Sequence, residues 1–287
     1  MGKIRRFILL AILCVCTCST AIAAKQSEWT KLTIAAEAAY NNHELKLAES
    51  NFRAAAKVAE ANADSRLRLA TTYFRLAFVL QDEDKFVDAE KYLKEAIKLE
   101  NGQPDGPLVW QFKWKLAQVF AREQKYSDVE EILLKLIKTR ADIMGTRGGD
   151  YWLQLIYLSE AQLKLGKLKE SELSAEKALD SAGKSHNKEH AHGALMRLGL
   201  AQRKAGKLKD ANASFTEALR FAKDLEAYEL ICEALKELGI TADMLGEKAA
   251  RDSYFKNCLE LAHSNLSKGQ ADWLRIQINE CERGGTQ

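Results

Sequence analysis

Apolar and polar positions along this chain follow the spacing of α-helices. A column of mostly small residues recurs every 40–42 residues, with a mostly large apolar residue four positions later and a mostly small one three further on. Spacings of four and three place the positions on one helix face, so this helix is predicted to occur six times. The columns are Ala48, Ala89, Val129, Ser171, Ala211 and Arg251; Phe52, Leu93, Leu133, Ala175, Phe215 and Phe255; and Ala55, Ala96, Leu136, Ala178, Ala218 and Cys258.

A second helix is predicted upstream of each of these. It carries a core residue at Ala35, Leu76, Leu116, Leu158, Leu198 and Leu238, followed at once by Ala36, Ala77, Ala117, Ser159, Gly199 or Gly239. The first residue fills the core, and the small one lets a neighbouring helix approach closely. Gly166, Gly206 and Gly246 lie between the helices, where glycine enters the left-handed conformation without a Cβ clash. The repeating unit is helix, turn, helix.

At these residues the chain resembles the tetratricopeptide repeat family, most clearly in LSEAQLKLGKLKESELSAEKAL (158–179) and LGLAQRKAGKLKDANASFTEAL (198–219). The period exceeds the family's usual length of about 34 residues and is similar to the longer variant of kinesin light chains. In that variant the helices meet through G-x-x-H or G-x-x-x-P loops, matched here at 183–186 and 102–107, and at 145–150 without the histidine. His43 in the first repeat, and Lys248 and Arg251 in the sixth, depart from the pattern.

The resemblance implies an all-α solenoid of helical hairpins that winds into a right-handed superhelix. We place six repeats within 24–265, at about 29–62, 70–103, 110–143, 152–185, 192–225 and 232–265. Residues 266–287 then form a capping helix and tail, because the open end of a solenoid needs cover. Trp273, Leu274, Ile276 and Ile278 are predicted to supply that cover.

The first 23 residues have the order of a secretory signal peptide. Lys3, Arg5 and Arg6 precede an apolar run that ends in small residues at 21–23, which predicts cleavage after Ala23 and export to the periplasm or outside the cell. The alternative is a membrane anchor formed by residues 7–24, and a membrane is expected as a partner only in that case.

Charge argues against a nucleic-acid partner. Three of the 43 basic residues and none of the 40 acidic ones lie in the signal segment, so the mature chain has a formal net charge of zero. Binding to phosphates requires a surplus of Lys and Arg gathered on one face. The partner is instead predicted to be a protein or peptide, and no small-molecule substrate or cofactor is indicated.

The segment HNKEHAH, at 186–192, contains the H-x-x-E-H spacing of a zinc peptidase. A catalytic zinc site needs three converging protein ligands, whereas the resemblance places His186 on a loop between repeats. We therefore predict no metal site and no catalytic residues. A zinc hydrolase at 186–192 is the less favoured alternative.

Three cysteines remain after signal removal: Cys232, Cys258 and Cys281. Cys258 falls on the second helix of the last repeat and Cys281 on the capping helix. The sequence allows a disulfide between these two in an oxidising compartment. The alternative is a buried free thiol that acts as a small apolar group.

In the family, the first helix of each repeat lines the concave face, where ligands bind. The positions carried over are Phe74, Phe78, Trp114, Gln118, Ile156, Tyr157, Glu160, Met196, Arg197 and Leu200, with Thr33, Glu37, Lys236 and Ile240 at the two ends. The aromatic residues are either binding anchors or core.

We therefore predict an exported, non-catalytic adaptor with a partner-binding groove. The main alternative is a structural component of a cell-envelope assembly that uses its edges or convex face.

Overall fold

The computed structural model describes residues 28–61, 66–100, 107–144 and 151–282. Within these ranges the backbone forms helices and connecting turns, with no strand, so the predicted all-α fold is confirmed. The signal segment, the alternative anchor at 7–24 and the loops at 102–106 and 145–150 lie outside the described residues. Of the described helices, none has both the length and the apolar composition needed to cross a bilayer.

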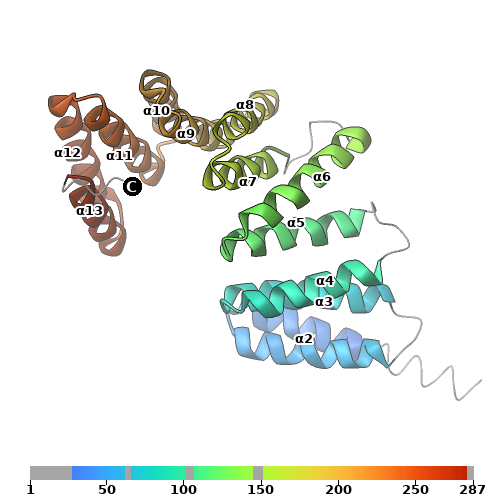
Figure 1. Ribbon diagram of the computed structural model, residues 1–287. Coiled ribbons are helices and arrows are strands. Elements are labelled where there is room, and N and C mark those ends of the chain that lie inside the picture. Colours follow the sequence, from blue (N-terminus) through green and yellow to red (C-terminus); the bar gives the residue numbers. More distant parts are fainter. Residues whose placement is uncertain (1–27, 62–65, 101–106, 145–150, 283–287) are drawn as a thin grey trace, which may run out of the picture. The chain divides into compact units, whose positions relative to one another are not determined.

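The chain divides into two compact units, residues 1–125 and 126–287. The first described helix of unit 1 spans residues 28–41, and Figure 1 shows the helices that follow it. The bounds are α2 (Leu45–Glu60), α3 (Arg66–Asp82), α4 (Phe86–Leu99) and α5 (Pro107–Arg122). Within this unit α2 packs against α3, α3 against α4, and α4 against α5.

Unit 2 continues the alternation of first and second helices. Consecutive helices again pack together, and α7 also contacts α9, as expected for first helices of successive repeats. The bounds are α6 (Tyr126–Met144), α7 (Tyr151–Lys164), α8 (Leu168–Ser185), α9 (Lys188–Lys204), α10 (Leu208–Asp224), α11 (Tyr228–Met244), α12 (Lys248–Asn265) and α13 (Lys268–Glu282).

The turns between paired helices use the left-handed conformation. Gly166, Gly206 and Gly246 have φ of 74°, 77° and 77°, which confirms the turn predicted from these glycines. The corresponding turns of unit 1 are made without glycine, since Asp84 and Gln124 have φ of 58° and 59°. A non-glycine residue accepts this conformation at a cost of about 1–2 kcal/mol.

The predicted columns form the core, with the exception of Ala35, which is exposed, so its assignment as a core residue is wrong. The small residue of every first helix is buried, and the large apolar column of the second helices is at most 2% exposed. Arg251 is the exception in its own column: it stays half-buried, and its guanidinium donates to Asp243 Oδ1 at 2.8 Å. The helix pair therefore closes around small residues at five of the six positions of that column.

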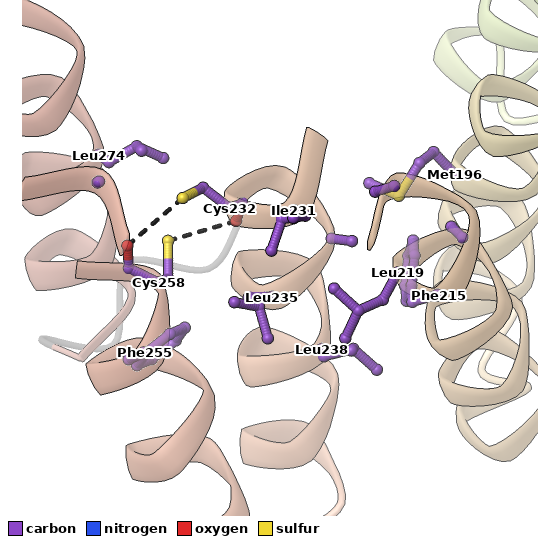
Figure 2. Packing of buried hydrophobic residues seen from close by; sticks show 14 of the residues in the cluster. Met196, Phe215, Leu219, Ile231, Cys232, Leu235, Leu238, Phe255, Cys258 and Leu274 are labelled. Carbon is purple, nitrogen blue, oxygen red and sulfur yellow. Dashed lines mark hydrogen bonds between the residues drawn. The ribbon is translucent and has the colours of Figure 1, made fainter. Parts of the chain in front are cut away.

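Glycine in the first helices permits an unusually close contact. A Cβ placed on Gly199 would lie 2.5 Å from the Phe215 ring, and one on Gly239 would lie 2.3 Å from the Phe255 ring. Figure 2 shows both rings within the buried cluster of unit 2. The phenyl ring therefore occupies the space that any side chain at the glycine position would need.

A ladder of ion pairs connects successive second helices at the surface. In unit 2, Lys167 Nζ donates to Glu130 Oε2 at 2.5 Å, and Lys207 Nζ donates to Glu172 at 2.7 and 2.8 Å. Lys85 with Glu49 and Lys125 with Glu90 repeat the pair in unit 1, both at 2.6 Å. The lysine side chains are 40–48% exposed but the carboxylates only 12–16%, so these pairs are more sheltered from solvent than ordinary surface pairs.

The last helix covers the preceding repeat with only part of the predicted set. Leu274 and Ile278 of α13 are buried, at 6% and 1% exposure, but Trp273 and Ile276 are more than half exposed. The prediction that all four residues pack on the last repeat is therefore wrong for Ile276, whereas the Trp273 ring, although largely exposed, lies with its centre 5.5 Å from Lys236 Nζ of α11. Residues four apart lie on the same face of a helix, so Leu274 and Ile278 share the face turned toward the repeat. Trp273 and Ile276 lie to the sides of that face.

Replacing Gly239 with alanine should destabilise the protein by about 1–3 kcal/mol, because the added methyl group collides with Phe255. This loss should outweigh the gain of about 1 kcal/mol that alanine brings to a helix interior. Urea unfolding of both proteins measures the difference. Gly193→Ala in α9 is the control, since its Cβ would meet Trp152 at an ordinary 3.5 Å. Equal effects of the two changes would contradict the close-contact argument.

Candidate functional site

A pocket of about 450 Å³ lies in unit 1 against its first helices, 28–41, α3 and α5. Its apolar lining includes Phe74 and Phe78 of α3 and Phe112 of α5. The Phe74 ring lies 4.9 Å from each of the other two, edge-on to Phe78 and tilted to Phe112. Phe74 and Phe78 are half-buried, so part of each ring remains available to a ligand.

The rim of this pocket is polar. Arg75 pairs with Glu37 at 2.8 Å, and both side chains remain about half exposed. The Tyr40 hydroxyl donates to Asp82 Oδ2 at 2.6 Å. Burial, together with this carboxylate, raises the pKa of Tyr40 to about 12, so the phenol keeps its proton near neutral pH. The pocket thus combines an aromatic base with groups that can hydrogen-bond a peptide.

Lys115 of α5 lies next to this aromatic cluster. It is 7% exposed, and its Nζ stands 3.6 Å from the centre of the Phe78 ring, a cation–π contact. Among the described residues, no carboxylate oxygen lies within 4.0 Å of Lys115 Nζ, the distance limit for an ion pair. Burial lowers the pKa of Lys115 to about 8, and the charge of Asp82 opposes that shift.

The predicted groove residues differ in their exposure. Three of them are almost fully buried: Trp114 at 9%, Ile156 at 8% and Met196 at 5%. Gln118 in unit 1 and Tyr157, Glu160, Arg197 and Leu200 in unit 2 are half-buried. Phe74 and Phe78 line the pocket in unit 1, and Glu160, Arg197 and Leu200 line another in unit 2.

Most residues of the unit 1 site were not predicted from the sequence, among them Phe112 in its aromatic base, the rim residues Tyr40, Arg75 and Gln111, and the adjacent Lys115. Phe112 was not assigned to the groove, although Leu108, Phe112 and Leu116 follow the four-residue spacing of one helix face. Lys115 was missed because a lysine in a helix is normally solvated, and its position in the repeat gives no sign of burial. Glu37, by contrast, was predicted as a groove residue of the first repeat, and it lines the pocket.

Comparisons with known proteins identify the fold. No protein-family model and no curated protein matches the chain. Among solved structures, the apo form of RapI aligns with a TM-score of 0.68 at 14% identity, over 89% of this chain and 98% of that one. Kinesin light chain TPR-like repeats from Podosopora anserina align with a TM-score of 0.62 at 15% identity, over 71% and 100%.

A third similar structure is a Rap protein complexed with competence and sporulation factor. It has a TM-score of 0.55 and 13% identity, over 90% of this chain and 75% of that one. The described residues have a tetratricopeptide-repeat fold. The predicted repeat type is therefore confirmed, including its likeness to kinesin-light-chain repeats. At these identities the likeness concerns the fold alone.

In this repeat fold the histidines of 186–192 lie in separate surroundings. His186 ends α8 in the left-handed conformation, at φ 52°. The His190 ring stacks on Trp152 with centroids 4.0 Å apart, while buried His192 places Nδ1 3.0 Å from the Ala218 carbonyl oxygen. The described residues contain no group of three or more His, Cys, Asp or Glu side chains that could hold a metal ion.

Cys258 contacts Cys232 across α11 and α12. Its thiol lies 3.3 Å from the Cys232 carbonyl oxygen, and the Cys232 thiol lies 3.5 Å from the Cys258 carbonyl oxygen (Figure 2). The contact with Cys232, together with burial, raises the pKa of Cys258. Cys281 is a half-buried free thiol. The Cys258–Cys281 disulfide stays a prediction.

Lys115→Met should increase stability more at pH 7 than at pH 9.5. The folded pKa of Lys115 lies below that of the unfolded chain, so the unfolded state binds more protons between about pH 8 and 10, and wild-type stability rises with pH there. The advantage of the methionine variant should shrink by on the order of 1 kcal/mol across this window. Urea unfolding at both pH values measures it. A difference independent of pH would contradict the buried-cation account.

Trp114→Ala should destabilise unit 1 by about 3–5 kcal/mol, because the side chain is 9% exposed and its removal leaves a cavity. Thermal and urea unfolding check the loss. Gln118→Ala, on the same helix but half-buried, is the comparison and should cost less. A loss below about 1 kcal/mol for Trp114→Ala would mean that the indole contributes little to packing.

Proposed function

We propose that this chain is a non-catalytic helical-repeat scaffold that binds a protein or peptide segment in the aromatic pocket of unit 1. The observation that carries the proposal is the partly exposed pair Phe74 and Phe78, set beside Phe112 within a pocket of about 450 Å³. Pockets of roughly 300–1,000 Å³ with apolar walls and a few polar groups are typical ligand sites.

The chemistry of the pocket fits a peptide. Aromatic residues supply most of the binding energy at many protein interfaces, because they bury a large area at little entropic cost. Glu37, Tyr40, Arg75 and Gln111 on the rim carry donors and acceptors that can pair with a peptide backbone. The similar Rap structure in complex with competence and sporulation factor supports the use of such a fold for binding.

The proposal includes export. Its support is the sequence of the first 23 residues: basic residues, then an apolar run, then small residues up to Ala23. Export would place both units in the periplasm or outside the cell, where an adaptor meets other exported proteins.

The alternative of an assembly component is favoured by a different observation. Val87 on α4 is 74% exposed and Leu47 on α2 is 50% exposed, so the second helices of unit 1 present apolar side chains to solvent. Isolated exposed apolar residues are common on protein surfaces, so they are weaker evidence for the assembly alternative than the pocket is for the adaptor.

The test begins with partners identified by proximity labelling in the native compartment, followed by calorimetry with a purified partner. Phe74→Ala should weaken binding by about 1–4 kcal/mol while the urea unfolding curve changes much less than for Trp114→Ala. Val87→Ser, outside the pocket, is the matched control and should leave the affinity unchanged. If Val87→Ser abolishes binding and Phe74→Ala does not, the assembly alternative replaces the adaptor proposal.

A further inference from the structure

A second pocket, of about 520 Å³, lies wholly within unit 2. Its walls come from the ends of three first helices, α7, α9 and α11 (Figure 1), and Cys281 of α13 lies at its border. Its lining contains four basic side chains and a single acidic one, Glu160, whereas the pocket in unit 1 has one of each sign. Charge therefore distinguishes the two pockets.

Two of the four cations are already neutralised. Arg203 Nη2 lies 2.7 Å from Glu237 Oε2, and its Nη1 donates to the Glu237 carbonyl oxygen at 3.4 Å. Arg197 pairs with Glu160 at 3.4 Å. These arginines are held by the protein and contribute little net charge to the pocket.

Lys164 and Lys204 are the two that remain. Both side chains are exposed at the pocket wall, and among the described residues no carboxylate oxygen lies within ion-pair distance of either. The two lysines are separated by one repeat period of 40 residues and end α7 and α9 respectively. The helix C-terminus has a partial negative charge, but it leaves most of each positive charge uncompensated.

The pocket is also apolar. Leu163, Leu200 and Ile240 are half-buried in its lining, and Met244 is 49% exposed. Covering this exposed apolar surface with another apolar surface is favourable by about 25 cal/mol for each Å² removed from water. Methionine is flexible and polarizable, and it adapts to partners of different shape.

We propose that this pocket binds an acidic amphipathic segment of a protein partner. Two carboxylates of the segment pair with Lys164 and Lys204, while an apolar side chain between them packs on Leu200, Ile240 and Met244. Charge complementarity determines the sign of the segment, and the apolar lining requires that it carry hydrocarbon side chains as well as charge.

A protein segment fits better than the other polyanions. Nucleic acid presents a continuous row of phosphates, whereas only two uncompensated cations line this pocket. A membrane surface would need a broad basic face, whereas this pocket is lined by the ends of three helices and offers two uncompensated cations. The site is separate from the aromatic pocket of unit 1, so it goes beyond the proposed function and can fail or succeed independently of it.

The full-length protein is tested with a fluorescein-labelled amphipathic peptide that has leucine at helical spacing and glutamate elsewhere. Fluorescence anisotropy should show binding that weakens as salt rises. Lys164→Gln combined with Lys204→Gln should raise Kd at least about tenfold. A control peptide has glutamine in place of every glutamate. Its affinity for the wild-type protein should be no higher than the affinity of the acidic peptide for the double variant.

The matched control is Lys169→Gln combined with Lys209→Gln. These lysines are exposed, also lie one period apart, and belong to the first turns of the second helices α8 and α10, outside the pocket. The control removes the same charge and should leave Kd unchanged. Equal losses in both double variants, no binding by wild type, or tight binding of the glutamine peptide would overturn the proposal.

Two further measurements separate this pocket from the aromatic pocket of unit 1 and from a general affinity for polyanions. Phe74→Ala in unit 1 should leave the affinity for the acidic peptide unchanged, so a failure of either proposal is recognised by itself. Single-stranded DNA and phosphatidylserine vesicles are added as competitors. If either displaces the peptide more effectively, at equal charge, than unlabelled acidic peptide does, the assignment to a protein partner is wrong.

Discussion

The structure depends on the close approach of two helices at one small residue in each repeat. Where that residue is glycine, as at Gly239, the ring of Phe255 fills the position that a methyl group would take. Where it is serine, the hydroxyl must be satisfied, and Ser159 and Ser171 do this by donating to each other's carbonyl oxygens at 2.8 Å. Both solutions keep the backbones close, and the second also gives two buried hydroxyls the hydrogen bonds that burial requires.

This contact determines which surfaces remain for binding. The core face of each first helix packs within the repeats, so binding depends on side chains of that helix that lie off this face. Phe74 lies two positions before the core residue Leu76, and Leu200 lies two positions after Leu198. Both pockets form where such neighbours from alternate helices come together, and their chemistry then depends on the residues that each repeat carries there.

The period of the sequence was enough to predict the fold but not the site. The spacing of apolar, small and glycine residues predicts the paired helices, the turns between them and most buried positions, because equivalent residues pack in the same way in each repeat. Phe74 and Trp114 occupy equivalent positions, yet one is half-buried in a pocket wall and the other is 9% exposed. Their burial depends on contacts with neighbouring helices, which periodicity within one chain does not specify. For the same reason the buried cation at Lys115 could not be foreseen.

The net charge of the chain likewise does not predict the charge of an individual pocket. With the first 23 residues removed, the basic and acidic residues balance, and no run of basic residues indicates that cations gather on one face. A repeat of constant period nevertheless brings equivalent positions together in space, so Lys164 and Lys204 reach one pocket although 40 residues separate them. The neighbouring arginines pair with Glu160 and Glu237, and this pairing leaves the lysines as the charge that a ligand meets. In a repeat protein, therefore, the field at a site is set by equivalent positions and their local pairing rather than by the total charge of the chain.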